Sequence, residues 1–408
     1  MAHPKVVAFV LAGGKGERLF PLTVFRSKPS VPFGGRYRIV DFVLSSLINS
    51  GIYSIYLLVQ YKSQSLIEHV RQNWSFSSVL RDHFVAVVPP QMRMGPEWFQ
   101  GTADAVFQNV NIIKELNPDI VLIFGSDHIY RMDIQQMIDF HINNNALVTV
   151  AARPVPIEQA SSFGIISADS NGRITGFQEK PKTPDHIPGD PTRAYCSMGN
   201  YLFNKDTLIE ALARAQKKKQ HDFGSHVIPY LVKTDRVFSY DFSNNVIQGT
   251  YDYEEKSYWR DVGTIAAFFD AHMDTLGPNP VFNTDNRAWP LSHSGSEGPA
   301  ARILNGHIKN SLIASGCVIG RAKIENCVIR CGAVIEDNVV LKDCIIFDDV
   351  VIRKGAKLNR VIVDKLNVID AGEEIGYDDI KDKFRCHIDV SGIRVIPKAG
   401  IAKTRTKL

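Results

Sequence analysis

The chain has 408 residues, of which 44% are hydrophobic and 22% charged. This composition is typical of a globular protein of two or three domains, and it excludes disordered and collagen-like chains. The 47 lysines and arginines exceed the 43 aspartates and glutamates by only four charges, too few for a protein that must neutralise many phosphates of a nucleic acid. The six cysteines include no C-x-x-C pair, so we expect neither a zinc site nor a disulfide framework.

No apolar run in the sequence reaches the roughly 20 residues that a membrane-spanning helix needs. Residues 6–12 form a short apolar run after Lys5, but glycines and charges follow it without a small-residue cleavage site. We therefore expect a cytoplasmic protein with reduced thiols, no membrane partner and no nucleic-acid partner.

The first 276 residues alternate short apolar runs with helical segments. We predict strands at 6–11, 54–60, 84–88 and 119–124, and helices at 41–49, 63–72, 102–116 and 133–143. This alternation indicates βαβ units and a parallel sheet covered on both faces. After residue 163 the strands shorten and the pattern becomes mixed. The prediction for residues 1–276 is therefore an α/β, Rossmann-like domain with a mostly parallel or mixed sheet.

Residues 277–300 are rich in Pro, Gly, Asn and Ser, which is typical of a linker. From 301 to 408, aliphatic residues recur every five or six positions, a period that fits a hexapeptide-repeat β-helix better than a β-sandwich. We predict a left-handed parallel β-helix that serves oligomerisation and regulation. Its inward side chains would be Ile319, Ile324, Ile329, Ile335, Val340, Ile346, Ile352, Leu358, Val363, Ile369 and Ile375.

A glycine-rich turn follows the first strand. It runs Leu11-Ala12-Gly13-Gly14-Lys15-Gly16-Glu17-Arg18. Glycines let backbone N–H groups approach phosphate oxygens, but the segment matches neither the Walker A loop nor G-x-G-x-x-G. A plain strand-to-loop turn is therefore the alternative. Four cations in residues 26–38 favour a polyphosphate pocket.

These motifs resemble the signature of the sugar-nucleotide pyrophosphorylases, which are nucleotidyltransferases acting on sugar 1-phosphates. Segments 33–42, 98–106, 177–181, 197–201 and 258–264 narrow the resemblance to the bacterial ADP-glucose pyrophosphorylases, over nearly the whole chain. The resemblance implies the reaction ATP + α-D-glucose 1-phosphate = ADP-glucose + pyrophosphate, in glycogen biosynthesis. It also implies Mg²⁺, small anionic metabolites as allosteric effectors, and a homotetramer.

The resemblance assigns catalytic roles to five residues. Asp127 and Asp261 would bind the Mg²⁺ ion, Arg18 and Lys28 would contact the leaving pyrophosphate, and Lys180 would bind the sugar phosphate. Asp127 follows an apolar strand, at the edge where parallel sheets bind ligands, although an isolated Asp can also cap a helix. Thr264 is better placed than Asp261 to cap the following helix.

The remaining site residues are also implied by the resemblance. The nucleotide would contact Leu11, Ala12, Gly13, Gly14, Lys15, Gly16, Gln60, Gly101, Thr102 and Asp104. The sugar phosphate would contact Gly164, Glu179, Lys180, Ser197, Tyr201 and Trp259. No general base is expected, because the attacking phosphate oxygen is already ionised near neutral pH.

Regulation and substrate choice leave alternatives open. Arg26 and Arg38 are candidate effector contacts, although a role near the active site is equally consistent. Phe25 stands where relatives that respond to fructose 1,6-bisphosphate carry a lysine, so we expect no activation by that effector. The alternatives are a uridylyl- or thymidylyltransferase and a catalytically weak regulatory subunit. An acyltransferase is disfavoured because no histidine lies between His307 and His387.

Overall fold

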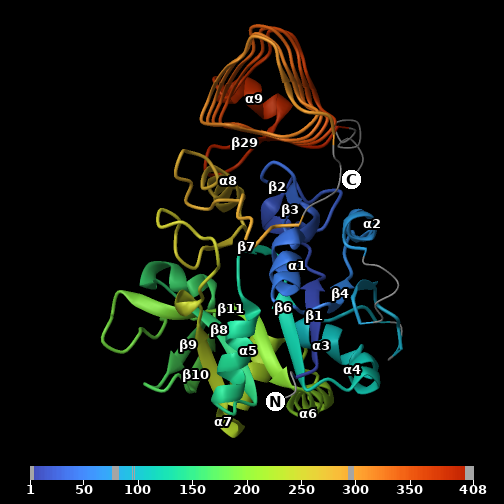
Figure 1. The fold of residues 1–408 in the computed structure, drawn as a ribbon, viewed down its shortest axis with the longest axis vertical. Coiled ribbons are helices and arrows are strands. Elements are labelled where there is room, and N and C mark those ends of the chain that lie inside the picture. Colours follow the sequence, from blue (N-terminus) through green and yellow to red (C-terminus); the bar gives the residue numbers. More distant parts are fainter. Residues whose placement is uncertain (1–3, 76–81, 94, 96, 293–297, 400–408) are drawn as a thin grey trace.

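A computed structural model describes residues 4–75, 82–93, 95, 97–292 and 298–399. Residues 293–297 of the expected linker and 400–408 of the expected β-helix domain lie outside this part. The molecule consists of an α/β domain with a β-helix stacked on one end of it (Figure 1). Within the described residues, no helix is both long enough and apolar enough to cross a membrane.

The α/β domain is built on one nine-stranded mixed sheet. Its strands are β1 (Val6–Ala12), β4 (Ser54–Val59), β5 (Phe84–Val88), β6 (Ile120–Gly125), β8 (Val148–Pro156), β9 (Gly164–Ala168), β10 (Ile174–Glu179), β11 (Arg193–Asn204) and β12 (Val237–Asp241). The order is β10-β9-β11-β6-β1-β4-β5, and β8 pairs with β11 and β12. Strands β6, β1, β4 and β5 are parallel, whereas β11 is antiparallel to β6. The predicted fold class of this domain is confirmed.

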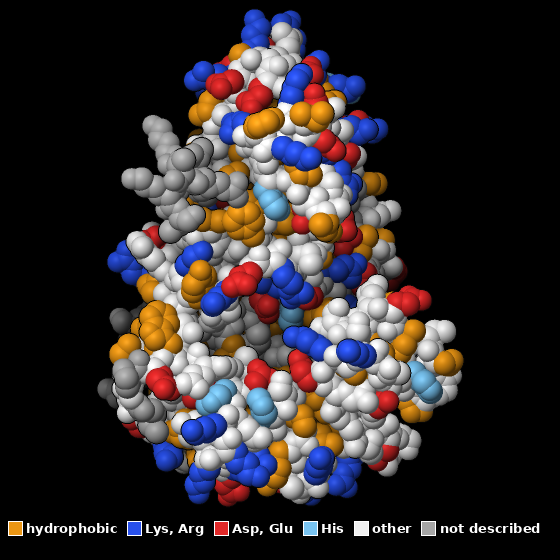
Figure 2. All heavy atoms as spheres, turned by 180° about the vertical axis from the view of Figure 1, so that it is seen from behind, with side chains coloured by type: hydrophobic (Ala, Val, Ile, Leu, Met, Phe, Trp, Pro, Cys, Tyr) orange, Lys and Arg blue, Asp and Glu red, His pale blue; other side chains and the backbone are white. Residues whose placement is uncertain are grey.

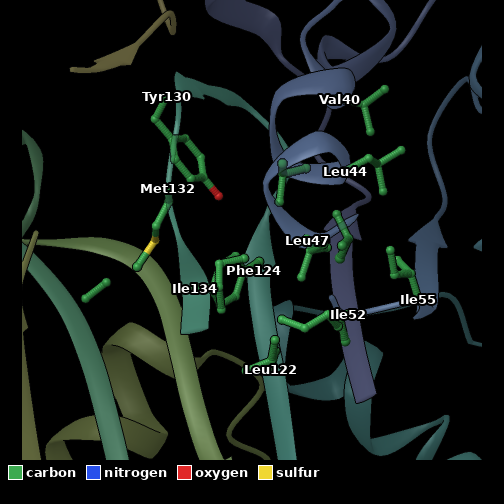
Figure 3. Close-up of a cluster of buried hydrophobic side chains, with 14 of the residues drawn as sticks. Val40, Leu44, Leu47, Ile52, Ile55, Leu122, Phe124, Tyr130, Met132 and Ile134 are labelled. Carbon is green, nitrogen blue, oxygen red and sulfur yellow. The ribbon is translucent and has the colours of Figure 1, made fainter. Parts of the chain in front are cut away.

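Helices cover both faces of the sheet. Successive apolar side chains of β1 point to opposite faces, so each face needs a cover that buries them. Ala8 and Val10 pack in the cluster that contains α1 (Val40–Asn49), α2 (Gln64–Asn73) and α5 (Ile134–Asn143). Figure 3 shows Leu47 of α1 close to Phe124 of β6, with Leu44 and Val40 farther along the same helix. Val7 and Phe9 pack in the opposite cluster, which contains residues of α3 (Thr102–Phe107), α4 (Val110–Leu116), α6 (Lys205–Lys217) and α7 (Ile228–Thr234).

The single helix predicted for residues 102–116 is wrong, because the structure divides it into α3 and α4. Asn109 leaves the helical conformation, with φ −115° and ψ 17°. Its N–H donates to the oxygen of Val106, three residues back, and its side chain donates to that of Ala105. Asparagine competes in this way for backbone groups.

The β-helix has three sheets of mainly parallel strands, one on each side of its triangular cross-section (Figure 1). The first sheet contains β14 (Arg302–Ile303), β17 (Val318–Ile319), β20 (Val334–Ile335), β23 (Val351–Ile352) and β26 (Val368–Ile369). The second contains β15 (His307–Lys309), β18 (Lys323–Glu325), β21 (Val340–Lys342), β24 (Lys357–Asn359) and β27 (Glu374–Ile375). The third contains β16 (Leu312–Ile313), β19 (Val328–Ile329), β22 (Ile345–Ile346), β25 (Val361–Val363), β29 (Arg394–Ile396) and β28 (His387–Ile388). This arrangement agrees with the predicted left-handed β-helix.

Ten of the eleven predicted inward side chains are buried in the β-helix core. The exception is Val340, which is only partly buried, whereas its neighbour Leu341 is 1% exposed. Because side chains alternate along a strand, a shift of one residue reverses the direction of the side chain. The prediction for Val340 is therefore wrong by one residue.

The two domains share a hydrophobic cluster at their junction. Phe33 of β2 (Pro32–Phe33), Tyr37 of β3 (Tyr37–Arg38) and Phe268 of α8 (Ile265–Met273) belong to the same buried cluster as Ile345 and Phe347 of the β-helix. A short helix, α9 (Asp379–Arg385), follows the last coil. The division into residues 1–276, 277–300 and 301–408 stays a prediction.

Candidate active site

Two short strands bring the predicted metal carboxylates together. Strand β13 (Trp259–Asp261) pairs antiparallel with β7 (His128–Tyr130), so that Asp261 lies opposite His128. Asp127 directly precedes β7, at the carboxyl end of β6. This pairing places the two carboxylates, far apart in the sequence, on one site.

Lys28 connects the two carboxylates. Its Nζ donates to Oδ2 of Asp127 at 3.0 Å and to Oδ1 of Asp261 at 3.1 Å, and the residue is 6% exposed. Burial lowers the pKa of Lys28, but the two carboxylates outweigh it and raise the pKa above its ordinary value. Burial raises the pKa of Asp127, but the positive charge of Lys28 and the nearby His128 outweigh burial, so the net pKa falls below its ordinary value. Lys28 and Asp127 are therefore both charged at neutral pH.

The same residues can hold a metal ion. Ligand atoms of Asp127, His128 and Asp261 all lie within 4.8 Å of one another. Nε2 of His128 is 3.6 Å from Oδ1 of Asp127 and 3.9 Å from Oδ1 of Asp261. Two carboxylates suit a hard divalent cation that also takes phosphate oxygens and water as ligands. The donor set therefore fits a divalent ion such as Mg²⁺.

The glycine-rich loop lies beside this carboxylate pair. Gly16 has φ +65°, and its oxygen accepts a hydrogen bond from Oγ1 of Thr23. A Cβ at position 16 would lie 2.9 Å from Cβ of Lys28, so the position requires glycine for both space and conformation. Nη2 of Arg18 lies 4.0 Å from Oδ2 of Asp261. The loop, the two cations and the two carboxylates form one contiguous surface.

This surface lines a cleft of about 790 Å³. Figure 2 shows the molecule hollowed near its middle, with acidic, basic and histidine side chains around the hollow. The predicted site residues that line the cleft are Leu11, Ala12, Gly13, Gly14, Lys15, Gly16, Arg18, Lys28, Gln60, Gly101, Thr102, Asp127, Gly164, Glu179, Lys180, Ser197, Tyr201, Trp259 and Asp261.

One wall of the cleft is fixed by backbone contacts. The side chain of Gln60 donates to the oxygen of Phe99 and accepts from its N–H. Gly101 lies so close to the carbonyl of His221 that any Cβ would collide with it. Asp104 does not line the cleft; its carboxylate instead accepts from the N–H of Gln100 and from the side chain of Gln108. In this structure Asp104 thus holds the loop before α3 instead of facing the cleft.

The opposite wall carries the residues expected to bind the sugar phosphate. Burial raises the pKa of Glu179, an effect that Lys180 opposes and Asp222 supports. Nζ of Lys180 lies 3.6 Å from Oε1 of Glu179, and the lysine side chain is 66% exposed, free to meet a ligand. Burial raises the pKa of Tyr201, so its hydroxyl stays protonated as a donor.

Several residues of the cleft were missing from the predicted site residues. Phe163, Asp222 and Gly224 line it. Asp222 accepts from Oγ1 of Thr102 and caps the turn at Ser225. In the sequence, Asp222 looks like an ordinary helix-capping residue. It reaches the cleft because α3 packs against the turn that contains it, a contact that the sequence does not reveal.

The two candidate regulatory arginines lie outside the cleft, near the β-helix. Nη2 of Arg26 donates to both oxygens of Asp364, at 2.8 and 3.0 Å. Its Nη1 is buried and has no hydrogen-bond partner among the described residues. Arg38 donates to the backbone oxygen and hydroxyl of Ser65. Burial, partly opposed by Asp41, lowers the pKa of Arg38 to about 10.

Comparison with known proteins agrees with this geometry. A family model described as nucleotidyl transferase matches residues 7–277, and a GlmU-like C-terminal hexapeptide model matches residues 299–396. The chain therefore belongs to the nucleotidyl transferase family.

Within that family, the similar proteins compared next are all named glucose-1-phosphate adenylyltransferase. The chain is 68% identical to the glucose-1-phosphate adenylyltransferase of Thermodesulfovibrio yellowstonii, over 97% of both chains. It is 46% identical to that of an Anaeromyxobacter species, over 97% of this chain and 98% of the relative. It is 44% identical to that of Corynebacterium glutamicum, over 97% of both. The resemblance seen in the sequence is confirmed.

Proposed function

We propose that this chain is an enzyme that transfers the adenylyl group of ATP to α-D-glucose 1-phosphate, giving ADP-glucose and pyrophosphate. The observation that carries the proposal is the cleft in which Lys28 joins Asp127 and Asp261 beside a glycine-rich loop. The printed names of the relatives support this choice of nucleotide and sugar. ADP-glucose formed here would serve glycogen biosynthesis.

The reaction needs positioning and charge stabilisation, not proton abstraction. The nucleophile is an ionised oxygen of the sugar phosphate, which Lys180 binds and aims at the α-phosphate of ATP. As the bond to the leaving pyrophosphate breaks, negative charge grows on that group. We expect Arg18, Lys28 and the backbone N–H groups of residues 13–16 to stabilise this charge.

We assign the divalent ion to Asp127 and Asp261 and propose that it is Mg²⁺. When bound, Mg²⁺ neutralises phosphate charge and orients the phosphate oxygens. Asp127 and Asp261 hold it by their carboxylates. Lys28 balances those carboxylates and would donate to a phosphate oxygen of the nucleotide.

The sugar is recognised by the polar wall of the cleft. Glu179 accepts hydrogen bonds from glucose hydroxyls, while Ser197 and Tyr201 donate and accept them. Trp259 and Gly164 shape the pocket around the ring. On the nucleotide side, Gln60, Gly101 and Thr102 border the base and ribose.

The assembly and regulation follow from the resemblance. We propose a cytoplasmic homotetramer that responds to small anionic metabolites bound near Arg26 and Arg38. The unpartnered Nη1 of Arg26 supports an anion contact there. The mass of the assembly in solution should be about four times the 45.6 kDa of one chain.

Pyrophosphate release by the purified chain tests the function. We expect Mg²⁺-dependent release with ATP and α-D-glucose 1-phosphate, and a much lower kcat/KM with GTP, CTP, UTP or dTTP. A preference for UTP or dTTP would instead support a uridylyl- or thymidylyltransferase. No release with any nucleotide would support a regulatory subunit.

A further inference from the structure

A buried arginine of the β-helix holds a hairpin of the α/β domain. Arg330 follows β19 and is 3% exposed. Its Nη1 donates to three backbone oxygens of the β2–β3 hairpin: those of Phe33 at 2.9 Å, Gly34 at 2.9 Å and Tyr37 at 3.0 Å. Hydrogen bonds from a charged guanidinium are stronger than those from a neutral donor, so this contact holds the hairpin firmly.

The other side of Arg330 is anchored within the β-helix. Its Nε donates to Oδ2 of Asp348 at 3.0 Å, and Nζ of Lys365 lies 2.9 Å from the same oxygen. Asp348 is itself largely buried, with 15% of its side chain exposed. Arg330 is therefore fixed by its own domain and presents Nη1 to the hairpin in one orientation.

The hairpin is linked to Lys28 by a short, stiff segment. The turn Lys28–Ser30 ends one residue before β2, and that residue, Val31, donates its N–H to the oxygen of Lys28. The N–H of Ile39, just after β3, donates to the oxygen of Val31. Pro29 and Pro32 fix two backbone φ angles within this segment. A shift of the hairpin is thus transmitted to Lys28.

The contacts of Lys28 leave little tolerance for such a shift. Its Nζ meets two carboxylates at 3.0 and 3.1 Å, and its Cβ lies against Gly16. A misplacement of about 1 Å in a reacting group costs up to about 100-fold in rate.

We propose that Arg330 is a positioning residue of the catalytic site, which holds Lys28 against Asp127 and Asp261 through the β2–β3 hairpin. The proposal rests on the proposed function for the role of Lys28 as a contact of the pyrophosphate group. It assigns to the β-helix a direct part in the geometry of the reaction.

The test is a double-mutant cycle of Arg330→Met and Lys28→Ala. For Arg330→Met alone we expect kcat/KM for ATP to fall about 10- to 100-fold, with KM for α-D-glucose 1-phosphate changed less than about twofold. The Kd of Mg²⁺–pyrophosphate, measured by calorimetry, should rise in the same variant. In the Lys28→Ala background, Arg330→Met should change both quantities less than about twofold, because the residue through which it acts is gone.

Two further variants separate positioning from stability. Arg330→Lys keeps a cation beside the three carbonyls and should restore much of the loss. Asp348→Asn removes the negative charge beside Nε but keeps the donor to the hairpin; it should give a smaller loss in the same direction, and it serves if Arg330→Met fails to fold. The matched control is Arg385→Lys, which alters an arginine bonded to Glu373 and the backbone of Val368, and should leave kcat/KM unchanged.

Equal losses from Arg330→Met with and without Lys28 would overturn the proposal, as would full activity of a folded Arg330→Met protein. A wild-type chain that forms no ADP-glucose would refute the proposed function instead. In that case the same double-mutant cycle, measured by the Kd of Mg²⁺–pyrophosphate alone, would still show whether Arg330 positions Lys28. A wild-type chain that binds no pyrophosphate would refute both.

Discussion

Lys28, Asp127 and Asp261 form a partly buried group of two negative charges and one positive charge. The single positive charge leaves a net negative site, so a divalent cation can still be attracted to it. At the same time Lys28 prevents the two carboxylates from repelling each other while no metal is bound. The opposite charges of the three side chains thus hold the site together.

Replacing Asp127 by Asn should abolish most of the turnover without unfolding the protein. An amide can still accept from Lys28, but it loses the charge that the metal requires. We expect kcat to fall by about 10²–10³ with an unchanged thermal transition, measured by pyrophosphate release and circular dichroism. Near-normal activity would contradict the metal assignment.

Replacing Lys180 by Ala should affect one substrate selectively. Its side chain is 66% exposed and has no role in the core, so folding should be unaffected. A lost charge-assisted hydrogen bond corresponds to about 10–100-fold in affinity. Steady-state kinetics should show that rise in KM for α-D-glucose 1-phosphate and little change for ATP; equal rises for both substrates would refute the assignment.

Individual site residues could be predicted from the sequence only where they belong to a recognisable motif. Asp127 and Asp261 were predicted from the resemblance, and no periodicity could have shown that β13 pairs with β7. Asp222 was missed because an isolated Asp before a turn is more often a cap. Asp104 was expected at the nucleotide, but its carboxylate bonds to Gln100 and Gln108 instead.

Helix α8 carries a buried histidine beneath the β2–β3 hairpin. His272 is 0% exposed, its Nδ1 lies 2.8 Å from the oxygen of Phe268, and its ring is 4.3 Å from that of Phe33. Burial, reinforced by Arg330, lowers the pKa of His272 to about 3. The ring is therefore neutral in the folded protein.

This histidine should make the protein sensitive to acid. The unfolded chain binds a proton near pH 6.5 and the folded chain only near pH 3, so the free energy of unfolding should fall as the pH drops between these values. One proton corresponds to about 1.4 kcal/mol per pH unit. Urea unfolding at pH 7 and pH 5 should show this loss, and His272→Phe should reduce it. An identical pH dependence in both proteins would contradict the prediction.

Helices and strands were predicted best where the spacing of apolar residues was regular. The strands at 84–88 and the helix at 41–49 agree closely with β5 and α1. The break between α3 and α4 was missed because a single Asn109 does not disturb the apolar pattern. Val340 was chosen over Leu341 because two adjacent aliphatic residues fit a six-residue period equally well.

In the whole molecule, the two domains are joined by a common apolar cluster and by ion pairs such as Arg26–Asp364. Replacing one partner of such a buried pair is costly, because the other charge is left uncompensated. An effector that binds near Arg26 therefore has a direct connection to both domains. The sequence could not predict this junction, since its partners are scattered along the chain.

Fructose 1,6-bisphosphate should not activate this enzyme. Phe25 is 50% exposed beside Arg26, and an apolar ring cannot bind a phosphate group. We expect activity to change less than about twofold in an assay with a panel of sugar phosphates. Strong activation by this effector would contradict the inference. Phe25→Lys is the informative companion variant, because it supplies the missing cation.

The contact between Gly16 and Lys28 limits how the enzyme can be engineered. A methyl group at 16 would meet Cβ of the lysine at 2.9 Å, whereas one at Gly14 would meet no atom within 4 Å. Position 16 should therefore stay glycine, whereas side chains of increasing size can be placed at position 14. They would enter the cleft without touching the scaffold, which offers a graded route to inactive but intact variants.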